Sequence, residues 1–370
     1  MKIAILANNK TDFINPLARG LHSMLSKLNV DSDVLYDGHK WLTNPNHRTA
    51  TGKINYTNLA KKIIKETYCK TVFCRKLKKY DIIVAVINMP SSFLKTYMQN
   101  LDIIRKNLNT PIVNYDLHYL GTRGPWIDWI LNGNPVHNIL PGIGYGLERY
   151  DYYLMLSVVN EFPMPKAAHP CSVIGADLND GTLFSEQNEK FIALLDFERK
   201  NFLPERKIQI EALEETNTDY LILDRKYTLD EIRSIYRKTA ICFLAHRESF
   251  GLPICELQAC GSYIFSPYEH WAGSHYIKDI YLPWEENLSS NFIIYNNEKE
   301  LLKNEIIRIK RNYNPHKVIE NFRNNYPHYW EGDLDKLSEF IKKVKAGEIH
   351  SQLHKEHMAL NDTIIRKIQE

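Results

Sequence analysis

Two glutamates, Glu248 and Glu256, are separated by seven residues in the stretch ESFGLPICE. The apolar run at residues 240–245 before them predicts a buried parallel strand. Pro253 suits the first turn of a helix and Gly261 the position just past its end, so a two-turn helix is expected to follow. The pattern therefore predicts a strand, a loop that carries Glu248, and a short helix that carries Glu256.

A strand, a loop and a helix start in this order can bind a phosphate group. The first N–H groups of a helix have no partner within the helix, and the helix dipole attracts negative charge to them. Gly251 in the loop lets the backbone approach a ligand closely, because it has no Cβ. Glu256 can accept hydrogen bonds from ribose hydroxyls, and Glu248 can accept them from a sugar. The alternative is an ordinary strand, loop and helix in which Glu248 is solvated and Glu256 only favours the helix dipole.

The full stretch, E-S-F-G-L-P-I-C-E-L-Q-A-C-G, resembles the E-x7-E signature of retaining glycosyltransferases of family 4, which have the GT-B fold. The resemblance implies that Glu248 takes part in sugar transfer and that the residues after it bind a nucleotide-sugar donor. The expected donor-binding residues are Ser249, Phe250, Gly251, Leu252, Pro253 and Glu256.

Length and composition indicate a globular protein of two domains. The chain has 370 residues, of which 44% are hydrophobic and 25% charged. No window approaches about 18 consecutive apolar residues, and the apolar run at the N-terminus is too short for a signal peptide, so we expect a cytoplasmic protein. The 47 basic and 44 acidic residues nearly balance, which argues against nucleic acid as a partner.

The first half of the chain is typical of a Rossmann-like domain. Apolar runs at residues 2–6 and 34–36, with a helical pattern between them, predict an opening strand, helix and strand. Further strands are predicted at 81–88 and 111–116. His118 follows the last of these, at the edge where open α/β sheets bind ligands. The family resemblance implies that a His at this position contacts the donor sugar; the alternative is a structural or merely exposed side chain.

A D-x-D pair, Asp31 and Asp33, superficially matches the metal motif of the other large glycosyltransferase fold. Its predicted position between the first helix and the second strand is at the end of the sheet opposite the usual ligand crevice. We therefore expect no metal here. The family resemblance implies metal-independent catalysis without a cofactor, in which the nucleoside-diphosphate sugar is the donor substrate.

Residues 57–79 form a candidate amphipathic helix with eight Lys or Arg and one acidic residue, Glu66. Two interpretations of this helix remain open. Either it covers the sheet and exposes a solvated basic face, or it lies on an anionic membrane surface, at the inner face of a membrane. The residues of its predicted apolar stripe are Leu59, Ile63, Ile64, Phe73 and Leu77.

The family resemblance implies an α/β fold of the GT-B type, with two Rossmann-like domains facing across a cleft. Three prolines in residues 158–171 mark the domain boundary, and residues 172–177, S-V-I-G-A-D, are similar to the interdomain signature of family 4. Residues 1–168 are expected to form the acceptor-side domain and residues 169–333 the donor domain. Terminal helices within 334–370 are expected to cross back onto the first domain.

The donor domain is predicted to open with a strand at residues 191–195, followed by a charged loop. In family 4 an Arg and a Lys flank this loop and neutralise the donor diphosphate, and the matching residues are Arg199 and Lys207. The Gly-Arg that usually follows the strand is absent here and the loop is longer. Lys200 and Arg206 are therefore alternatives for the same role.

The function implied by these features is transfer of a sugar from a nucleoside-diphosphate sugar to the hydroxyl of a glycan, a lipid-linked acceptor or a small molecule. Retention of the anomeric configuration follows from the resemblance alone. Glu248, His118, Lys207 and Arg199 are the candidate catalytic residues. The alternative function is a non-catalytic protein of the same fold that binds a sugar nucleotide or a glycan.

Overall fold

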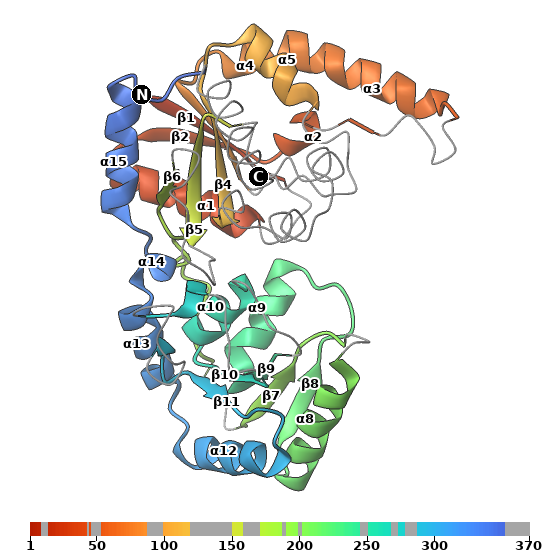
Figure 1. The fold of residues 1–370 in the computed structure, drawn as a ribbon, viewed down its shortest axis with the longest axis vertical. Helices are drawn as coiled ribbons and strands as arrows, with labels where there is room; N and C mark the ends of the chain where they lie inside the picture. The colour runs from red at the N-terminus through yellow and green to blue at the C-terminus, as the bar shows by residue number, and fades with distance from the viewer. Residues whose placement is uncertain are drawn as a thin grey trace, which may run out of the picture. The chain divides into compact units, whose positions relative to one another are not determined.

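The structure is a computed structural model, and it describes residues 1–8, 14–42, 44–45, 53–86, 99–118, 150–157, 171–186, 190–198, 202–244, 251–267, 273–277 and 287–351. Contacts divide these residues into two units, each built on a parallel sheet (Figure 1). Unit 1 comprises the described residues up to Gly175 and from Asp333 onward, and unit 2 runs from Ala176 to Gly332. The strand β6 (Cys171–Val173) joins the sheet of unit 1, so this unit extends beyond residue 168.

The sheet of unit 1 has six parallel strands in the order β2-β1-β3-β4-β5-β6. The strands before β6 are β1 (Lys2–Leu6), β2 (Asp31–Leu35), β3 (Ile82–Val86), β4 (Ile112–His118) and β5 (Tyr152–Ser157). β3 and β5 are buried along their whole length, because these apolar runs are covered by helices on both faces. The strands predicted at residues 2–6, 81–88 and 111–116 are confirmed as β1, β3 and β4.

Helices cover both faces of this sheet. On one face α1 (Ile14–Lys27) contacts α15 (Leu334–Lys345), and Phe340 of α15 packs against Tyr152 of β5. On the other face apolar side chains from a π-helical turn and two helices share one core with β1, β3 and β4. These elements are the turn Cys69–Phe73, α4 (Cys74–Leu77) and α5 (Gln99–Asn107). The helix α15 thus belongs to unit 1 although it follows unit 2 in the chain.

The helix predicted at residues 57–79 is interrupted. α3 (Tyr56–Tyr68) ends in the π-helical turn, and α4 follows. The wider turn changes the direction of the side chains after it, so Phe73 and Leu77 are buried while Ile64 is exposed. The prediction of one apolar stripe along the whole segment is therefore wrong. Among the described helices, none is long and apolar enough to cross a membrane.

Asp31 and Asp33 lie at the amino end of β2, within 3.2 and 3.0 Å of the Lys2 ammonium. The Tyr80 hydroxyl donates to Asp33 over 2.7 Å, and this hydrogen bond together with that from Lys2 lowers the pKa of Asp33 to about 2. Both carboxylates therefore pair with Lys2 at the amino ends of the strands, which is the edge of the sheet opposite the ligand edge. In the described part of the chain, no group of three or more His, Cys, Asp or Glu could hold a metal ion.

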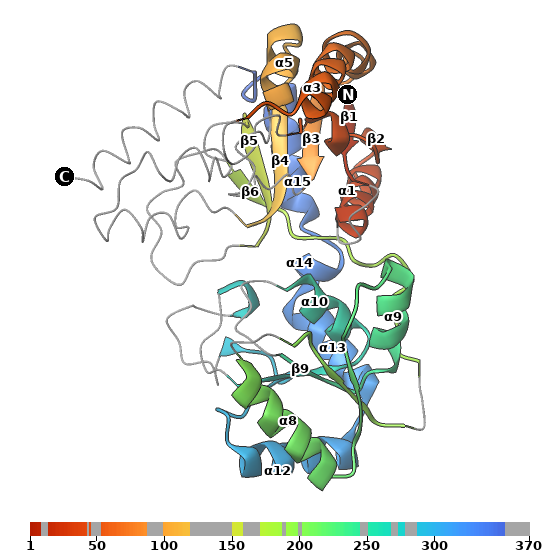
Figure 2. The same ribbon diagram turned by 90° about the vertical axis from the view of Figure 1, so that its right-hand side faces the viewer.

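The sheet of unit 2 has five parallel strands in the order β11-β10-β9-β7-β8. They are β7 (Ile192–Leu195), β8 (Asp219–Ile222), β9 (Ile241–Phe243), β10 (Tyr263–Ser266) and β11 (Phe292–Ile294). On one face α8 and α12 lie side by side (Figure 2), and on the other α10 contacts both α9 and α13. These helices are α8 (Leu203–Glu215), α9 (Leu229–Lys238), α10 (Leu252–Ala259), α12 (Lys299–Asn312) and α13 (Pro315–Asn325). The short helix α14 (Pro327–Trp330) follows them.

The strands β7 and β9 are neighbours in the sheet, although β8 comes between them in the chain. The chain therefore crosses from one side of β7 to the other, which makes a topological switch point between β7 and β9. In open α/β sheets, ligands bind in the crevice at the carboxyl ends of the strands at such a point. The segments that follow Leu195 and Phe243 are thus the expected ligand-binding segments of unit 2.

Candidate functional site

The helix α10 begins after β9 with a glycine in a left-handed conformation. Gly251 has φ 64° and ψ 82°, a conformation that glycine adopts without steric cost. Leu252 opens the helix, Pro253 lies in its first turn, and no side-chain cap is found here among the described residues. The predicted order of strand, glycine and helix is confirmed, and it puts a helix start with uncapped N–H groups after a strand at the switch point.

Glu256 is buried in α10 and forms an ion pair with Arg233 of α9. The two residues are 4% and 2% exposed. The Oε1 atom of Glu256 is 2.5 Å from Nη2 and 3.2 Å from Nε of Arg233. Burial raises the pKa of Glu256, and the guanidinium opposes this rise. Each charge is therefore stable in the interior because the other is present.

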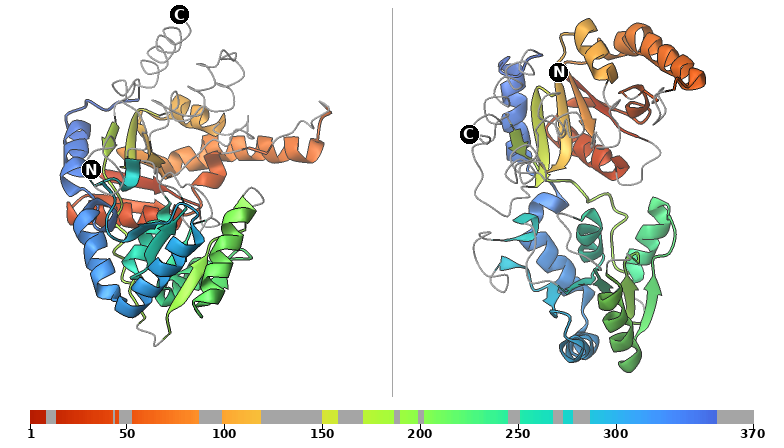
Figure 3. Two further views of the ribbon diagram at one scale, coloured as in Figure 1. Left: turned by 60° about the horizontal axis from the view of Figure 1, so that its bottom comes forward. Right: turned by 45° about the vertical axis from the view of Figure 1, so that its right-hand side comes forward.

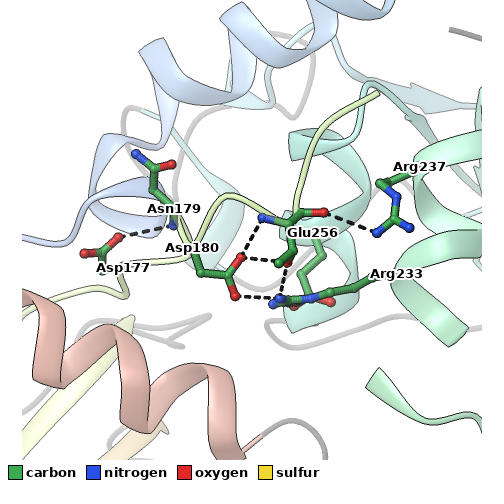
Figure 4. Close-up of polar contacts among 7 residues, drawn as sticks. Asp177, Asn179, Asp180, Arg233, Arg237 and Glu256 are labelled. Carbon is green, nitrogen blue, oxygen red and sulfur yellow. Dashed lines mark hydrogen bonds and ion pairs between the residues drawn. The ribbon is translucent and has the colours of Figure 1, made fainter. Parts of the chain in front are cut away.

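The same guanidinium binds residues 180–182, which belong to the segment by which the chain enters unit 2. Its Nη1 atom donates to Asp180 Oδ2 over 2.6 Å (Figure 4). The same atom donates to Thr182 Oγ1 over 2.6 Å. Thr182 in turn donates to Asp180 Oδ1 through its backbone N–H at 3.0 Å and its hydroxyl at 2.7 Å. Arg233 thus joins α9, α10 and residues 180–182 through one network, which is buried at Glu256 and exposed at Asp180 and Thr182.

Arg233 was not among the residues predicted from the sequence, although one signal for it exists. Arg233 lies one turn before Tyr236, on the face of α9 that is buried, and a charged side chain on a buried helix face needs an oppositely charged partner. The identity of that partner, 23 residues later, has no local signal. The ribose-binding role of Glu256 stays a prediction, to which the structure adds the pairing with Arg233.

Arg206 in α8 lies in the interior of unit 2 and has donor atoms that no described residue binds. The residue is 4% exposed, and its Nη2 atom donates to the carbonyl of Asp196, the residue after β7. Its Nε and Nη1 atoms are buried and have no partner among the described residues. Burial lowers the pKa of Arg206, and the Asp196 carboxylate opposes this shift. A buried guanidinium with unpaired donors, beside the end of a switch-point strand, is a candidate anion site.

Lys207, the next residue, lies on the solvent side of α8. Its side chain is 78% exposed, and its Nζ atom is 3.7 Å from Glu211 Oε1, one turn later. Of these two basic neighbours the structure thus buries only Arg206. The other predicted residues of this edge lie outside the described residues; they are Arg199, Lys200, Glu248, Ser249 and Phe250.

At the carboxyl edge of unit 1, His118 is the last residue of β4 and is paired in register with Ser157 of β5. The side chain of His118 lies outside what the structure describes. Two residues earlier in the strand Asp116 is 7% exposed, and it accepts a hydrogen bond from Asn114 Nδ2 over 3.2 Å. The strand that carries His118 thus also carries a buried hydrogen-bonded pair, Asn114 and Asp116.

Comparisons with known proteins support the architecture. No protein-family model matches the sequence, and no curated protein matches it either. Among solved structures, the sucrose-phosphate synthase from Thermosynechococcus elongatus is 14% identical with a TM-score of 0.52, over 94% of this chain and 100% of that chain. An alpha-glucosyltransferase in complex with UDP and a 13-mer DNA containing a central A:G mismatch is 12% identical with a TM-score of 0.51, over 93% and 100%.

A third similar structure comes from an enzyme of a different kind. The UDP-GlcNAc 2-epimerase from Neisseria meningitidis, bound to UDP-GlcNAc, is 9% identical with a TM-score of 0.53, over 94% of this chain and 100% of that chain. All three likenesses extend over nearly the whole of both chains, and each is a likeness of fold. The chain therefore has the GT-B fold, with two α/β units that are each built on a parallel sheet.

Proposed function

We propose that this protein is a glycosyltransferase that moves a sugar from a nucleoside-diphosphate sugar to an acceptor hydroxyl. The observation that carries the proposal is Arg206, a buried guanidinium whose Nε and Nη1 atoms have no partner among the described residues. It lies in the helix after β7, while the uncapped start of α10 follows β9, the neighbouring strand. Two groups that attract anions thus follow the two strands of the switch point.

The chemistry of transfer fits these groups. As the glycosidic bond to the donor breaks, negative charge grows on the leaving diphosphate. A cation that is shielded from water stabilises this charge more strongly than a solvated one. Arg206 is shielded, whereas Lys207 is exposed. We therefore assign the diphosphate contact to Arg206, the alternative to Lys207 that the sequence had left open.

The remaining roles rest on the E-x7-E stretch. Glu256 would accept hydrogen bonds from the ribose, Glu248 would contact the sugar, and His118 would contact the donor from unit 1. Retention of configuration and membership of family 4 are supported by the same stretch. The acceptor would be a carbohydrate or a glycolipid. Because enzymes with other reactions share this fold, the reaction class depends on these residues and not on the fold.

A panel of UDP-, GDP-, ADP- and dTDP-sugars tests the proposal. A ligand at about 100 times its dissociation constant stabilises a protein by about 2.7 kcal/mol, so one donor should raise the unfolding temperature clearly. The same donor should be hydrolysed slowly without acceptor, because a competent site leaks some transfer to water. A thermal shift without release of nucleoside diphosphate would favour the non-catalytic alternative. Appearance of a sugar epimer still attached to the nucleotide would favour an epimerase, and absence of any shift would reject the proposed donor site.

Chelation should leave transfer largely intact. Arg206 would supply positive charge where a metal ion would otherwise neutralise the diphosphate, and the described residues contain no group of three or more His, Cys, Asp or Glu that could hold a metal ion. The measurement is the transfer rate after treatment with EDTA and removal of the chelator, compared with the rate after adding back Mg²⁺ or Mn²⁺. A rate that is lost with EDTA and restored by either ion would show that the enzyme depends on a metal.

A further inference from the structure

The helix α3 is an exposed element of unit 1. None of its residues is buried, and it extends away from the sheet of unit 1 (Figure 3). Two contacts in its second half join it to the rest of unit 1: the ring of Tyr68 stacks on Trp41 of α2 (His39–Leu42) at 3.9 Å, and Glu66 Oε1 accepts from Asn44 Nδ2 over 3.0 Å. The first half of α3 therefore contributes little to the core.

Large apolar side chains are exposed on one side of this helix. Tyr56, Ile63 and Ile64 are 76%, 55% and 67% exposed. Their spacing of seven and eight residues, with Ala60 between them, places them on one side of the helix across two turns. Because these three side chains are exposed, packing within unit 1 does not explain why they are apolar. A contiguous exposed apolar patch on a helix is typical of a binding surface.

Basic residues accompany the apolar stripe. Lys61 follows Ala60 in α3, and Lys70 lies in the π-helical turn directly after this helix; both are exposed. Glu66 is the only acidic residue between residues 53 and 79. Its carboxylate is bound by Asn44 and lies 3.8 Å from Lys62, so it does not neutralise the other lysines. Further exposed basic residues follow in the same segment: Arg75, Lys76 and Lys78.

We propose that α3 binds the surface of an anionic phospholipid bilayer. Tyr56, Ile63 and Ile64 would enter the region between headgroups and acyl chains, and Lys61 and Lys70 would contact lipid phosphates. A helix with an exposed apolar stripe beside lysines has the two features that interfacial helices use, apolar burial and attraction to anionic lipid.

Charge also argues against a second copy of this chain as the occupant. Two α3 helices packed face to face would bring their lysines together, and like charges in contact oppose association. A helix of 13 residues is about 20 Å long. One stripe of this length falls short of the roughly 800 Å² per partner of a stable interface. Binding to a bilayer does not need so large an area, because attraction between the lysines and anionic lipids adds to the free energy gained by burying the apolar side chains.

The test is sedimentation of the full chain with vesicles of phosphatidylcholine alone and of phosphatidylcholine mixed with phosphatidylglycerol. The protein should bind the mixed vesicles, and added salt should weaken the binding. The double variant Ile63→Ser/Ile64→Ser should bind at least about tenfold more weakly, since two isoleucines no longer enter the bilayer. In Lys61→Gln/Lys70→Gln, each lost charge should lower binding about fivefold.

Matched controls keep the test specific. Leu301→Ser removes an exposed apolar side chain from α12, and Lys336→Gln removes an exposed charge from α15; neither should change vesicle binding. All four variants should unfold at the wild-type temperature, because the altered side chains are exposed. Equal binding to both kinds of vesicle, or wild-type binding by the α3 variants, would overturn the proposal. So would a dimer in sedimentation velocity that Ile63→Ser/Ile64→Ser dissolves while vesicles remain unbound.

Discussion

Replacement of Arg206 by methionine is expected to weaken nucleoside diphosphate binding and sugar transfer by about 10²-fold or more, which is about 2.7 kcal/mol. The same change should leave the unliganded protein as stable as the wild type, or more stable. Methionine fills much of the volume of arginine without a charge. Arg206 is a buried cation, and two of its donor atoms, Nε and Nη1, have no partner in the part of the chain that the structure describes. A buried donor without a partner costs about 1–3 kcal/mol, which the variant avoids.

A loss of nucleoside diphosphate affinity without a loss of stability distinguishes a ligand-binding residue from a structural one. Calorimetric titration with UDP and GDP measures the binding, transfer assays measure turnover, and urea unfolding measures the stability without ligand. If Arg206 served only to hold the Asp196 carbonyl, Arg206→Met would lower the free energy of unfolding and leave the affinity of the folded protein unchanged.

Lys207→Met is the matched control, since it removes the same charge one residue away. The Lys207 side chain is 78% exposed, so the variant should change stability by under about 0.5 kcal/mol and should retain nearly normal transfer. Loss of transfer in Lys207→Met with retention in Arg206→Met would return the diphosphate contact to Lys207. Full activity in both variants would remove α8 from the donor site.

Arg233→Met is expected to lower the free energy of unfolding by about 3–5 kcal/mol, because it leaves one charge of a buried pair without its partner. Glu256 is 4% exposed and has both Nε and Nη2 of Arg233 on one carboxylate oxygen. Arg237→Met is the control on the same helix. Arg237 pairs with Glu186 over 2.8 Å, but the two side chains are 19% and 30% exposed, so this variant should lose about 1 kcal/mol or less.

The loss in Arg233→Met should depend on pH in a defined direction. Burial raises the pKa of Glu256 above its ordinary 4.5, and Arg233 is the group that opposes this. Without Arg233 the folded-state pKa lies higher than the unfolded one, so stability is retained where both states are protonated and falls as the pH rises through the folded-state pKa. The difference in unfolding free energy between variant and wild type should therefore be small near pH 4.5 and largest at neutral pH and above.

The double variant Arg233→Met/Glu256→Leu should recover most of the stability, because no unpaired charge then remains at this position in α10. It also tests the second role predicted for Glu256. A stable double variant with weakened nucleotide affinity would support a contact between Glu256 and the ribose. Wild-type affinity in the same variant would leave Glu256 with the ion pair alone. A double variant as unstable as Arg233→Met would contradict the pairing as the source of the loss.

The sequence by itself determined the elements whose signals are local. The apolar runs of β1, β3 and β9 identify buried strands, because a parallel strand is covered on both faces. The start of α9 is equally local: the Thr228 side chain accepts from the N–H of Glu231, and the Glu231 carboxylate accepts from the N–H of Thr228. Gly251 and Pro253 at the start of α10 are local signals as well, because each acts on the backbone within one turn.

Tertiary structure alone decided which side chains of these elements are available for chemistry. Arg206 and Lys207 are adjacent basic residues of one helix, and only the packing of α8 against the strands of unit 2 buries the first and exposes the second. The partner of Glu256 lies 23 residues away in the chain, and the π-helical turn after α3 redirects Phe73 and Leu77 inward. Hydrogen-bonding and capping preferences act over a few residues. Burial and ion pairing depend on which distant elements pack together, and the spacing of residues in the chain does not show which elements these are.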